Sequence, residues 1–332
     1  MFTIFPVLAA VLLVLVGTAA LVGAYPLDFG DVLAVLRAAL TGGPAPDGQS
    51  MSVLLSIRLP RIAAALVLGA CLASAGTVYQ QIFRNPLVSP DILGVSAGAG
   101  LGAVAGIFLS LSVFGIQALA FLGGLGAVGM VLLIASAVRR QDSVLVLVLS
   151  GIVIGALAGS VTSLIKVLAD PYDQLPAITF WLLGSLAAVN LDDVAAALPV
   201  ALLGLLPLVV LRWKVDILSM GDEEARSLGL DVKKTRLVLI AGATLMTAAV
   251  VSFAGVVGWV GLIIPHLARM LVGPGFVRLL PAAALIGAAF MLAVDTLART
   301  VSSTEVPLGI ITSLIGAPIF VLLLARGRRV WS

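Results

Sequence analysis

The chain has 332 residues, of which 61% are hydrophobic and only 11% are charged, and its mean hydropathy is +1.23. A soluble domain typically carries about 25% charged residues, so this chain lacks the polar surface that a water-soluble fold requires. Its net charge of +3 comes with no basic stripe interleaved with aromatic residues, which argues against a nucleic-acid-binding protein.

Long apolar stretches predict membrane-spanning α-helices. A helix crosses the hydrocarbon core with about 20 apolar residues, and the short alternating segments of a membrane β-barrel are not seen in the sequence. We therefore predict an all-α polytopic membrane protein, with about ten transmembrane helices in a single bundle and one transmembrane domain over residues 1–332. The predicted spans are 4–24, 62–83, 92–110, 114–138, 143–168, 192–211, 236–256, 259–272, 279–298 and 307–325.

The segments between the spans differ in character. No Lys or Arg precedes Arg37, so the first apolar stretch lacks the basic region of a signal peptide and is predicted to be a retained span. Residues 25–57 contain T-G-G-P-A-P-D-G and predict an exposed outer loop. A short apolar stretch near 177–189 is too brief to cross and predicts a partial or re-entrant helix, whereas 212–236 is a long polar insertion.

Positive charge predicts the orientation. With both termini in the cytoplasm, fourteen of the nineteen Lys and Arg residues fall on the cytoplasmic side, as the positive-inside rule expects. The five on the other side or within helices are Arg37, Arg58, Arg61, Lys166 and Arg299.

Glycines recur at four-residue spacing in two spans. On a helix they form a stripe that lets a neighbouring backbone approach closely, although lining a pathway is an alternative. The two sets are Gly98, Gly102 and Gly106, and Gly151, Gly155 and Gly159.

Several chemistries have no residues to carry them. None of the four lysines follows a glycine, so the chain has no G-x-x-x-x-G-K-[ST] nucleotide loop. The single histidine, His266, cannot build a metal site alone, and Cys71 is expected to be a small packing residue. Lys166 and Asp295 are charged but lie near predicted helix ends, which disfavours ion-coupled transport and intramembrane catalysis.

The cytoplasmic insertion carries S-M-G-D-E-E-A-R-S-L-G-L. Gly221 and Asp222 are expected to begin a short helix whose acids favour its N-terminus, and Gly229 is expected to end it. Such a helix needs a partner or the end of the bundle to pack against, although a plain solvated loop remains an alternative.

Four sequence blocks resemble the FecCD family, the permeases of ABC importers for iron siderophores, haem and cobalamin. They run in family order over about residues 58–326. The blocks are R-L-P-R…N-P-L-V-S-P-D-I-L-G-V-S-A-G-A from Arg58, G-D-E-E-A-R-S-L-G-L from Gly221, F-A-G-V-V-G-W-V-G-L-I-I-P-H-L-A-R-M from Phe253, and A-V-D-T-L-A-R-T…G-A-P-I-F from Ala293.

The resemblance implies partners and site residues, with ATP and Mg on a partner ATPase and no cofactor or metal on this chain. Two permeases, as a homodimer or paired heterodimer, would assemble with two ATPases in the inner membrane, and a periplasmic binding protein would dock outside. The implied coupling helix comprises Gly221, Asp222, Glu223, Glu224, Ala225, Arg226, Leu228 and Gly229, with Ala225 and Leu228 as packing contacts. The implied docking residues are Arg58, Arg61 and Arg299, and the implied cytoplasmic gate is Asn85, Leu87, Ser150 and Gly151.

The resemblance leaves the cargo open. Siderophore-bound iron is the first expectation, with haem and cobalamin next and an oxyanion such as molybdate as an alternative. A non-transporting scaffold or sensor subunit is the binding-class alternative, and ATPase coupling would exclude it. Tyr172 and Trp181 are expected to be available for stacking in an outer vestibule, and no role is assigned to His266.

Overall fold

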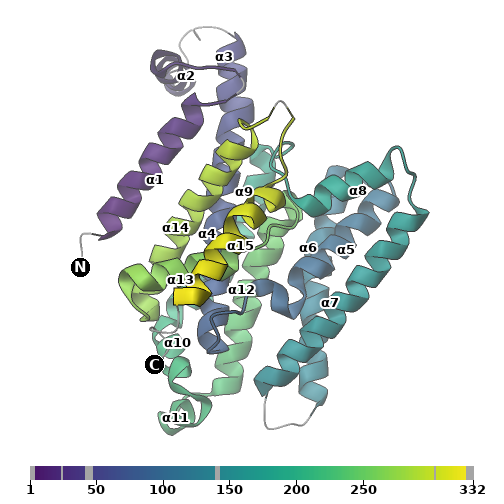
Figure 1. Cartoon of the computed structure of the whole chain (residues 1–332), viewed down its shortest axis with the longest axis vertical. Coiled ribbons are helices and arrows are strands. Elements are labelled where there is room, and N and C mark those ends of the chain that lie inside the picture. Colours follow the sequence, from purple (N-terminus) through teal and green to yellow (C-terminus); the bar gives the residue numbers. More distant parts are fainter. Residues whose placement is uncertain (1–3, 24, 42–47, 139–142, 303, 327–332) are drawn as a thin grey trace.

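The computed structural model describes residues 4–23, 25–41, 48–138, 143–302 and 304–326, and every regular element within them is helical (Figure 1). The α-helices are α1 (Ile4–Leu21), α2 (Phe29–Thr41), α3 (Gly48–Ser52), α4 (Leu59–Ile82), α5 (Val95–Phe108), α6 (Val113–Ala137), α7 (Ser143–Leu168), α8 (Gln174–Leu183), α9 (Leu191–Val210), α10 (Arg212–Met220), α11 (Asp222–Ser227), α12 (Val232–Ala254), α13 (Val260–Val272), α14 (Phe276–Ala298) and α15 (Leu308–Arg326). A π-helical turn, η1 (Val53–Arg58), joins α3 to α4, and a 3₁₀ turn, η2 (Pro90–Leu93), precedes α5.

All ten predicted spans are helical. Within the described residues, seven helices are long and apolar enough to cross a membrane, and the shorter α5, α13 and α15 coincide with the other three predicted spans. The partial helix predicted near 177–189 is α8, which both begins and ends a few residues earlier, at Gln174 and Leu183.

The long helix that ends with α4 lies at the centre of the bundle. It runs without interruption from Gly48 to Ile82, and α4 packs against α9, α12, α13 and α14. Two glycines allow this close packing, because a Cβ on Gly69 would lie 2.0 Å from the carbonyl oxygen of Gly287, and one on Gly76 would lie 1.9 Å from that of Gly261. Cys71, on the same helix, is buried as expected.

The two predicted glycine stripes behave differently. Gly98 and Gly102 of α5 pack against the α6 backbone, where a Cβ would come within 2.3 Å of Gly123 and 2.0 Å of Leu119. In α7 only Gly151 makes such a contact, whereas a Cβ on Gly159 would meet nothing within 4 Å. Tight packing therefore explains the first stripe but only the start of the second.

The exposed loop predicted for residues 25–57 is wrong for most of its length. The described residues there form α2, α3 and the η1 turn, while 42–47, which hold most of T-G-G-P-A-P-D-G, lie outside the described residues. The segment was misjudged because α2 is amphipathic and too short to register as a span: it buries Val35 and Ala38 and exposes Phe29 and Leu40. α2 and α3 stand at the end of the molecule opposite α11 (Figure 1).

Candidate functional site

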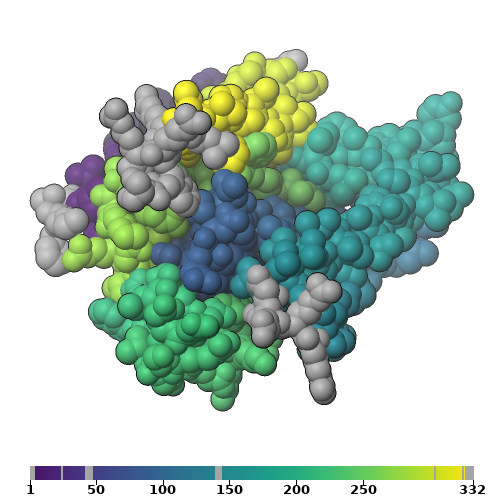
Figure 2. Space-filling model, turned by 60° about the horizontal axis from the view of Figure 1, so that its bottom comes forward, coloured from purple at the N-terminus to yellow at the C-terminus, as the bar shows by residue number. Residues whose placement is uncertain are grey.

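The predicted coupling segment protrudes from one end of the bundle. It forms α10, α11 and the start of α12, and Figure 2, which brings this end forward, shows the segment as a green lobe. The helix boundaries agree with the prediction, because α11 lies between Gly221 at φ 136° and Gly229 at φ +79°, conformations that favour glycine.

The side chains of α11 divide into two groups. Glu223, Glu224, Arg226 and Leu228 are exposed, and Leu228 is 62% exposed. Ala225 is completely buried within the chain itself, so its expected packing contact is made internally, and Leu228 is the apolar side chain that faces outward.

Two carboxylates attach this lobe to the spans. Asp222 accepts hydrogen bonds from Nη2 and Nη1 of the buried Arg236 on α12, at 2.7 and 3.2 Å. The hydrogen bond from the Arg236 guanidinium holds the pKa of the Asp222 carboxyl below its ordinary value, with smaller contributions from the charges of Arg84 and Arg226. In α10, Asp216 accepts a 2.7 Å hydrogen bond from the backbone N–H of Phe276, the first residue of α14. These contacts join α11 to the start of α12 and α10 to the start of α14.

The predicted gate residues lie near the same end. Asn85 and Leu87 are exposed in the turn after α4, where the Asn85 side-chain oxygen accepts a 2.9 Å hydrogen bond from the Leu87 N–H. Gly151 of α7 packs on η2, since a Cβ there would lie 2.0 Å from the carbonyl oxygen of Ile92, and Ser150 is buried beside it. The structure thus joins α7 to the turn that follows the N-P-L sequence.

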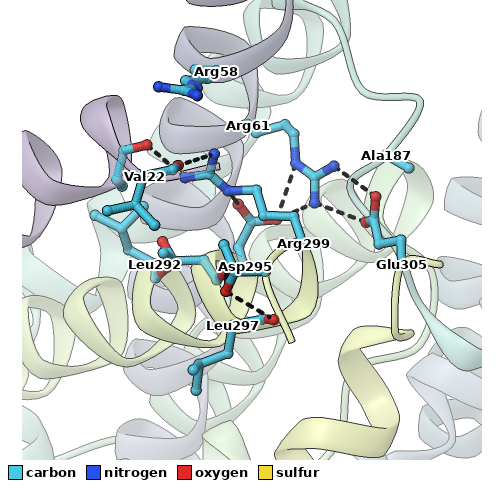
Figure 3. A network of polar contacts seen from close by, with 12 residues as sticks. Val22, Arg58, Arg61, Ala187, Leu292, Asp295, Leu297, Arg299 and Glu305 are labelled. Atoms are coloured by element: carbon cyan, nitrogen blue, oxygen red, sulfur yellow. Dashed lines mark hydrogen bonds and ion pairs between the residues drawn. The ribbon is translucent and has the colours of Figure 1, made fainter. Parts of the chain in front are cut away.

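The three predicted docking arginines gather at the opposite end, and we call them the arginine cluster (Figure 3). Although predicted as docking residues on the outer side, Arg58 and Arg61 are only 3% and 5% exposed. Arg61 donates to Asp295 from Nε and Nη2, at 3.2 and 2.7 Å, and to both oxygens of Glu305 from Nη1 and Nη2, at 2.8 Å each.

The other two arginines of the cluster hold the end of α1. Arg58 donates to the carbonyl oxygens of Ala20 and Tyr25. Arg299 donates to those of Ala19 and Val22, at 2.6 and 2.9 Å, and its Nε lies 3.6 Å from Asp295. Cationic side chains satisfy the free carbonyl groups at a helix C-terminus and also favour its dipole. The buried residues of α1 are Ala19 and Ala20, so the helix is buried at the same end that the arginines hold.

A cavity of about 440 Å³ opens near this end, between α5, α6 and α8. Trp181 and Phe180 of α8 line it together with Phe253 and Ser185. Tyr172 is 92% exposed and is not among the lining residues, so only Trp181 of the expected aromatic pair faces this space. No group of three or more His, Cys, Asp or Glu residues suited to a metal occurs among the residues that the structure describes.

Comparison with known proteins decides what this architecture is. The model of the FecCD transport family matches residues 10–326. The molybdate import permease MolB of Haemophilus influenzae is 39% identical over 308 residues, covering 93% of this chain and 91% of that protein. The cobalamin import permease BtuC of Halobacterium salinarum is 47% identical over 276 residues, covering 83% and 73%. A metal-chelate type ABC transporter solved in an inward-facing conformation matches with a TM-score of 0.89 and 36% identity, over 98% of this chain and 100% of that one.

The chain belongs to the FecCD transport family. It is a multi-pass ABC-transporter permease and not itself an ATPase, because ATP belongs to a separate subunit in this family. The all-helical bundle and the identification made from the four sequence blocks are confirmed.

Two carboxylates of this FecCD permease escaped notice in the sequence. Glu305 lies within the fourth family block but nothing in the sequence pairs it with Arg61, and Asp216 stands in the polar insertion with no motif around it. Asp295 was noted only as a charge near a helix end, and its role as a partner of Arg61 needed the fold, because the two lie 234 residues apart.

Proposed function

We propose that the chain carries a metal chelate from a periplasmic binding protein to the cytoplasm by alternating access, with a ferric siderophore as the first candidate cargo. The main support is the family match over residues 10–326 together with relatives named for such cargo. They include an iron chelatin permease of Helicobacter pylori, 41% identical over 280 residues, and the hemin permease HmuU of Yersinia pestis, 38% identical over 287 residues.

The proposed route through the spans is uncharged. Asp, Glu, Lys and Arg residues of the described spans lie near the ends of the helices, as with Lys166 in α7, Arg269 in α13 and Asp295 in α14, and the histidine His266 lies midway along α13. A cargo passing such a surface finds no fixed charge to bind or to exchange with an ion. This favours a weakly interacting passage driven by the ATPases over ion-coupled transport.

The proposed orientation puts α11 and both termini in the cytoplasm and the arginine cluster outside, in the inner membrane of the cell. It rests on the basic residues of 212–236 at the α11 end. Two ATPase subunits, a second permease copy and a binding protein complete the proposed complex.

At the cytoplasmic end, Glu223, Glu224, Arg226 and Leu228 are the proposed contacts with the ATPase. All four are exposed, whereas Asp222 and Ala225 hold α11 to its own chain. We assign the gate to Asn85, Leu87, Ser150 and Gly151, because the η2 turn and α7 touch at Gly151.

Molybdate is the second candidate cargo. The similarity to MolB favours this cargo, because that match covers 93% of this chain, whereas the match to BtuC covers 83%. Both candidates use the same permease architecture, so the choice between them depends on the binding protein.

The deciding experiment is ATP hydrolysis by the permease–ATPase complex in liposomes. The binding protein would be added empty or loaded with ferric siderophore, haem, cobalamin or molybdate. Stimulation by one loaded form identifies the cargo, and loss of that stimulation in Glu223→Lys with Glu224→Lys supports the coupling surface. A permease that forms no complex with any ATPase while α11 is intact would contradict the proposal and favour a scaffold.

A further inference from the structure

Arg61 is already occupied by groups of its own chain. Four of its five N–H donors make hydrogen bonds, two to Asp295 and two to Glu305 (Figure 3). Each edge of a guanidinium carries a pair of N–H donors, and that pair binds one carboxylate at a time. A carboxylate from a docking protein therefore has no free edge of Arg61 to bind.

The two internal partners differ in how easily they can leave. The Asp295 side chain is completely buried, whereas the Glu305 side chain is 26% exposed. Moving Asp295 away from Arg61 would leave a buried carboxylate next to apolar helices, which is costly. Glu305 can turn into water, where hydration replaces the lost ion pair, so Glu305 is the exchangeable partner.

Glu305 lies in the connection between α14 and α15, and this connection also contacts the residues that follow α8. The Ser185 hydroxyl donates to Glu305 at 3.4 Å, and the backbone N–H of Leu308 donates to the Gly184 carbonyl at 2.9 Å. Gly309 packs on the carbonyl of Leu183, which a Cβ would approach to 2.6 Å. Ser185 in turn lines the cavity beside α8.

We infer that Glu305 is an internal stand-in for an acidic side chain of the binding protein: Glu305 occupies Arg61 while the permease is alone and is displaced by a carboxylate of the binding protein on docking. This inference rests on the proposed function. Displacement releases Glu305 from Arg61 and moves the carboxylate that accepts from the Ser185 hydroxyl, so docking is communicated to the Gly184–Ser185 corner after α8 and to the adjoining cavity. Asp295 stays with Arg61 throughout and keeps the guanidinium in place.

The test is the affinity of the assembled permease–ATPase complex, in nanodiscs, for the binding protein loaded with the cargo that stimulates ATP hydrolysis. Glu305→Gln keeps the shape of the side chain and removes its charge, which frees one edge of Arg61. We expect about tenfold tighter binding, the size of effect that one charge-assisted contact supplies. Asp192→Asn is the matched control, because Asp192 is an exposed carboxylate in the first turn of α9 with no part in the arginine cluster. The control is expected to stay within about twofold of the wild type.

A second variant guards against misfolding. Glu305→Asp keeps the charge but withdraws the carboxylate by one methylene, so it should tighten binding less than Glu305→Gln does. Unchanged or weaker binding in both variants, with normal stability and a normal control, overturns the inference while leaving the proposed function intact. A wild-type complex that binds no loaded binding protein removes the proposed function, and this inference with it.

Discussion

Asp222 differs from the two glutamates that follow it, because its carboxylate is bound by a buried arginine. The Asp222 side chain is 24% exposed and that of Arg236 is 5% exposed, so water screens this pair only partly. The carboxylate therefore contributes to the free energy of unfolding as well as to the position of α11.

We predict that Asp222→Asn lowers the free energy of unfolding by about 1–2 kcal/mol near neutral pH, because a charge-assisted hydrogen bond to Arg236 is lost. The pKa of the Asp222 carboxyl is lowered in the folded protein. Its stabilising contribution is thus fully present above the ordinary carboxyl pKa and is lost as the pH falls through the lowered value. The difference in the free energy of unfolding between wild type and Asp222→Asn should be constant from about pH 5 to 8, as measured by thermal unfolding in detergent. Glu223→Gln, at an exposed position, should leave the unfolding temperature unchanged; a steep pH dependence of the difference within that range would contradict the assignment.

At the scale of single elements, α7 has a large apolar face with no partner among the described residues. Leu149, Ile152, Val153 and Leu157 are each more than half exposed, and Gly159 has open space where its side chain would be. Glycine and flanking aliphatic residues form the usual contact between membrane helices. We therefore propose this face as the contact with α7 of a second permease copy.

We predict that Gly159→Cys forms a disulfide-linked dimer when the complex is oxidised in membranes. The background is low because Cys71 is the only native cysteine and is buried. Gly129→Cys on α6 is the matched control, since a Cβ there also meets nothing within 4 Å. Equal cross-linking of the two variants on non-reducing gels would show random collision instead of an α7 interface.

For the whole molecule, the proposed orientation assigns α11 and the α7–α8 connection to opposite sides of the membrane. We predict that Ser227→Cys is labelled by an impermeant maleimide only after the membrane is opened, because α11 is placed in the cytoplasm. Tyr172→Cys, at a residue that is 92% exposed, should be labelled in cells whose outer envelope is permeabilised while the inner membrane is intact. The reverse pattern would invert the orientation and exchange the proposed docking and coupling ends.

The spans were predictable from the sequence because each apolar run is a local property, and the α11 boundaries followed from two glycines. Two features depended on the fold. α2 was not predicted because its apolar residues cover only part of an amphipathic helix. The burial of Arg61 could not be predicted because its partners Asp295 and Glu305 lie 234 and 244 residues away along the chain.

The uninterrupted helix from Gly48 to Ile82 has 35 residues, which corresponds to about 52 Å, well beyond the ~30 Å of the hydrocarbon core. The part from Arg61 to Ile82 alone spans roughly 32 Å, so the arginine cluster lies at the outer boundary of the hydrocarbon and the remainder rises about 20 Å above it. That height exceeds the roughly 5–8 Å of one headgroup layer. In the proposed orientation α2 and α3 thus form a rim above the lipid on one side of the arginine cluster, and an acidic side chain of the docking protein must extend past this rim to reach Arg61. Docking at Arg61 therefore depends on how far an acidic side chain of the binding protein projects below this rim.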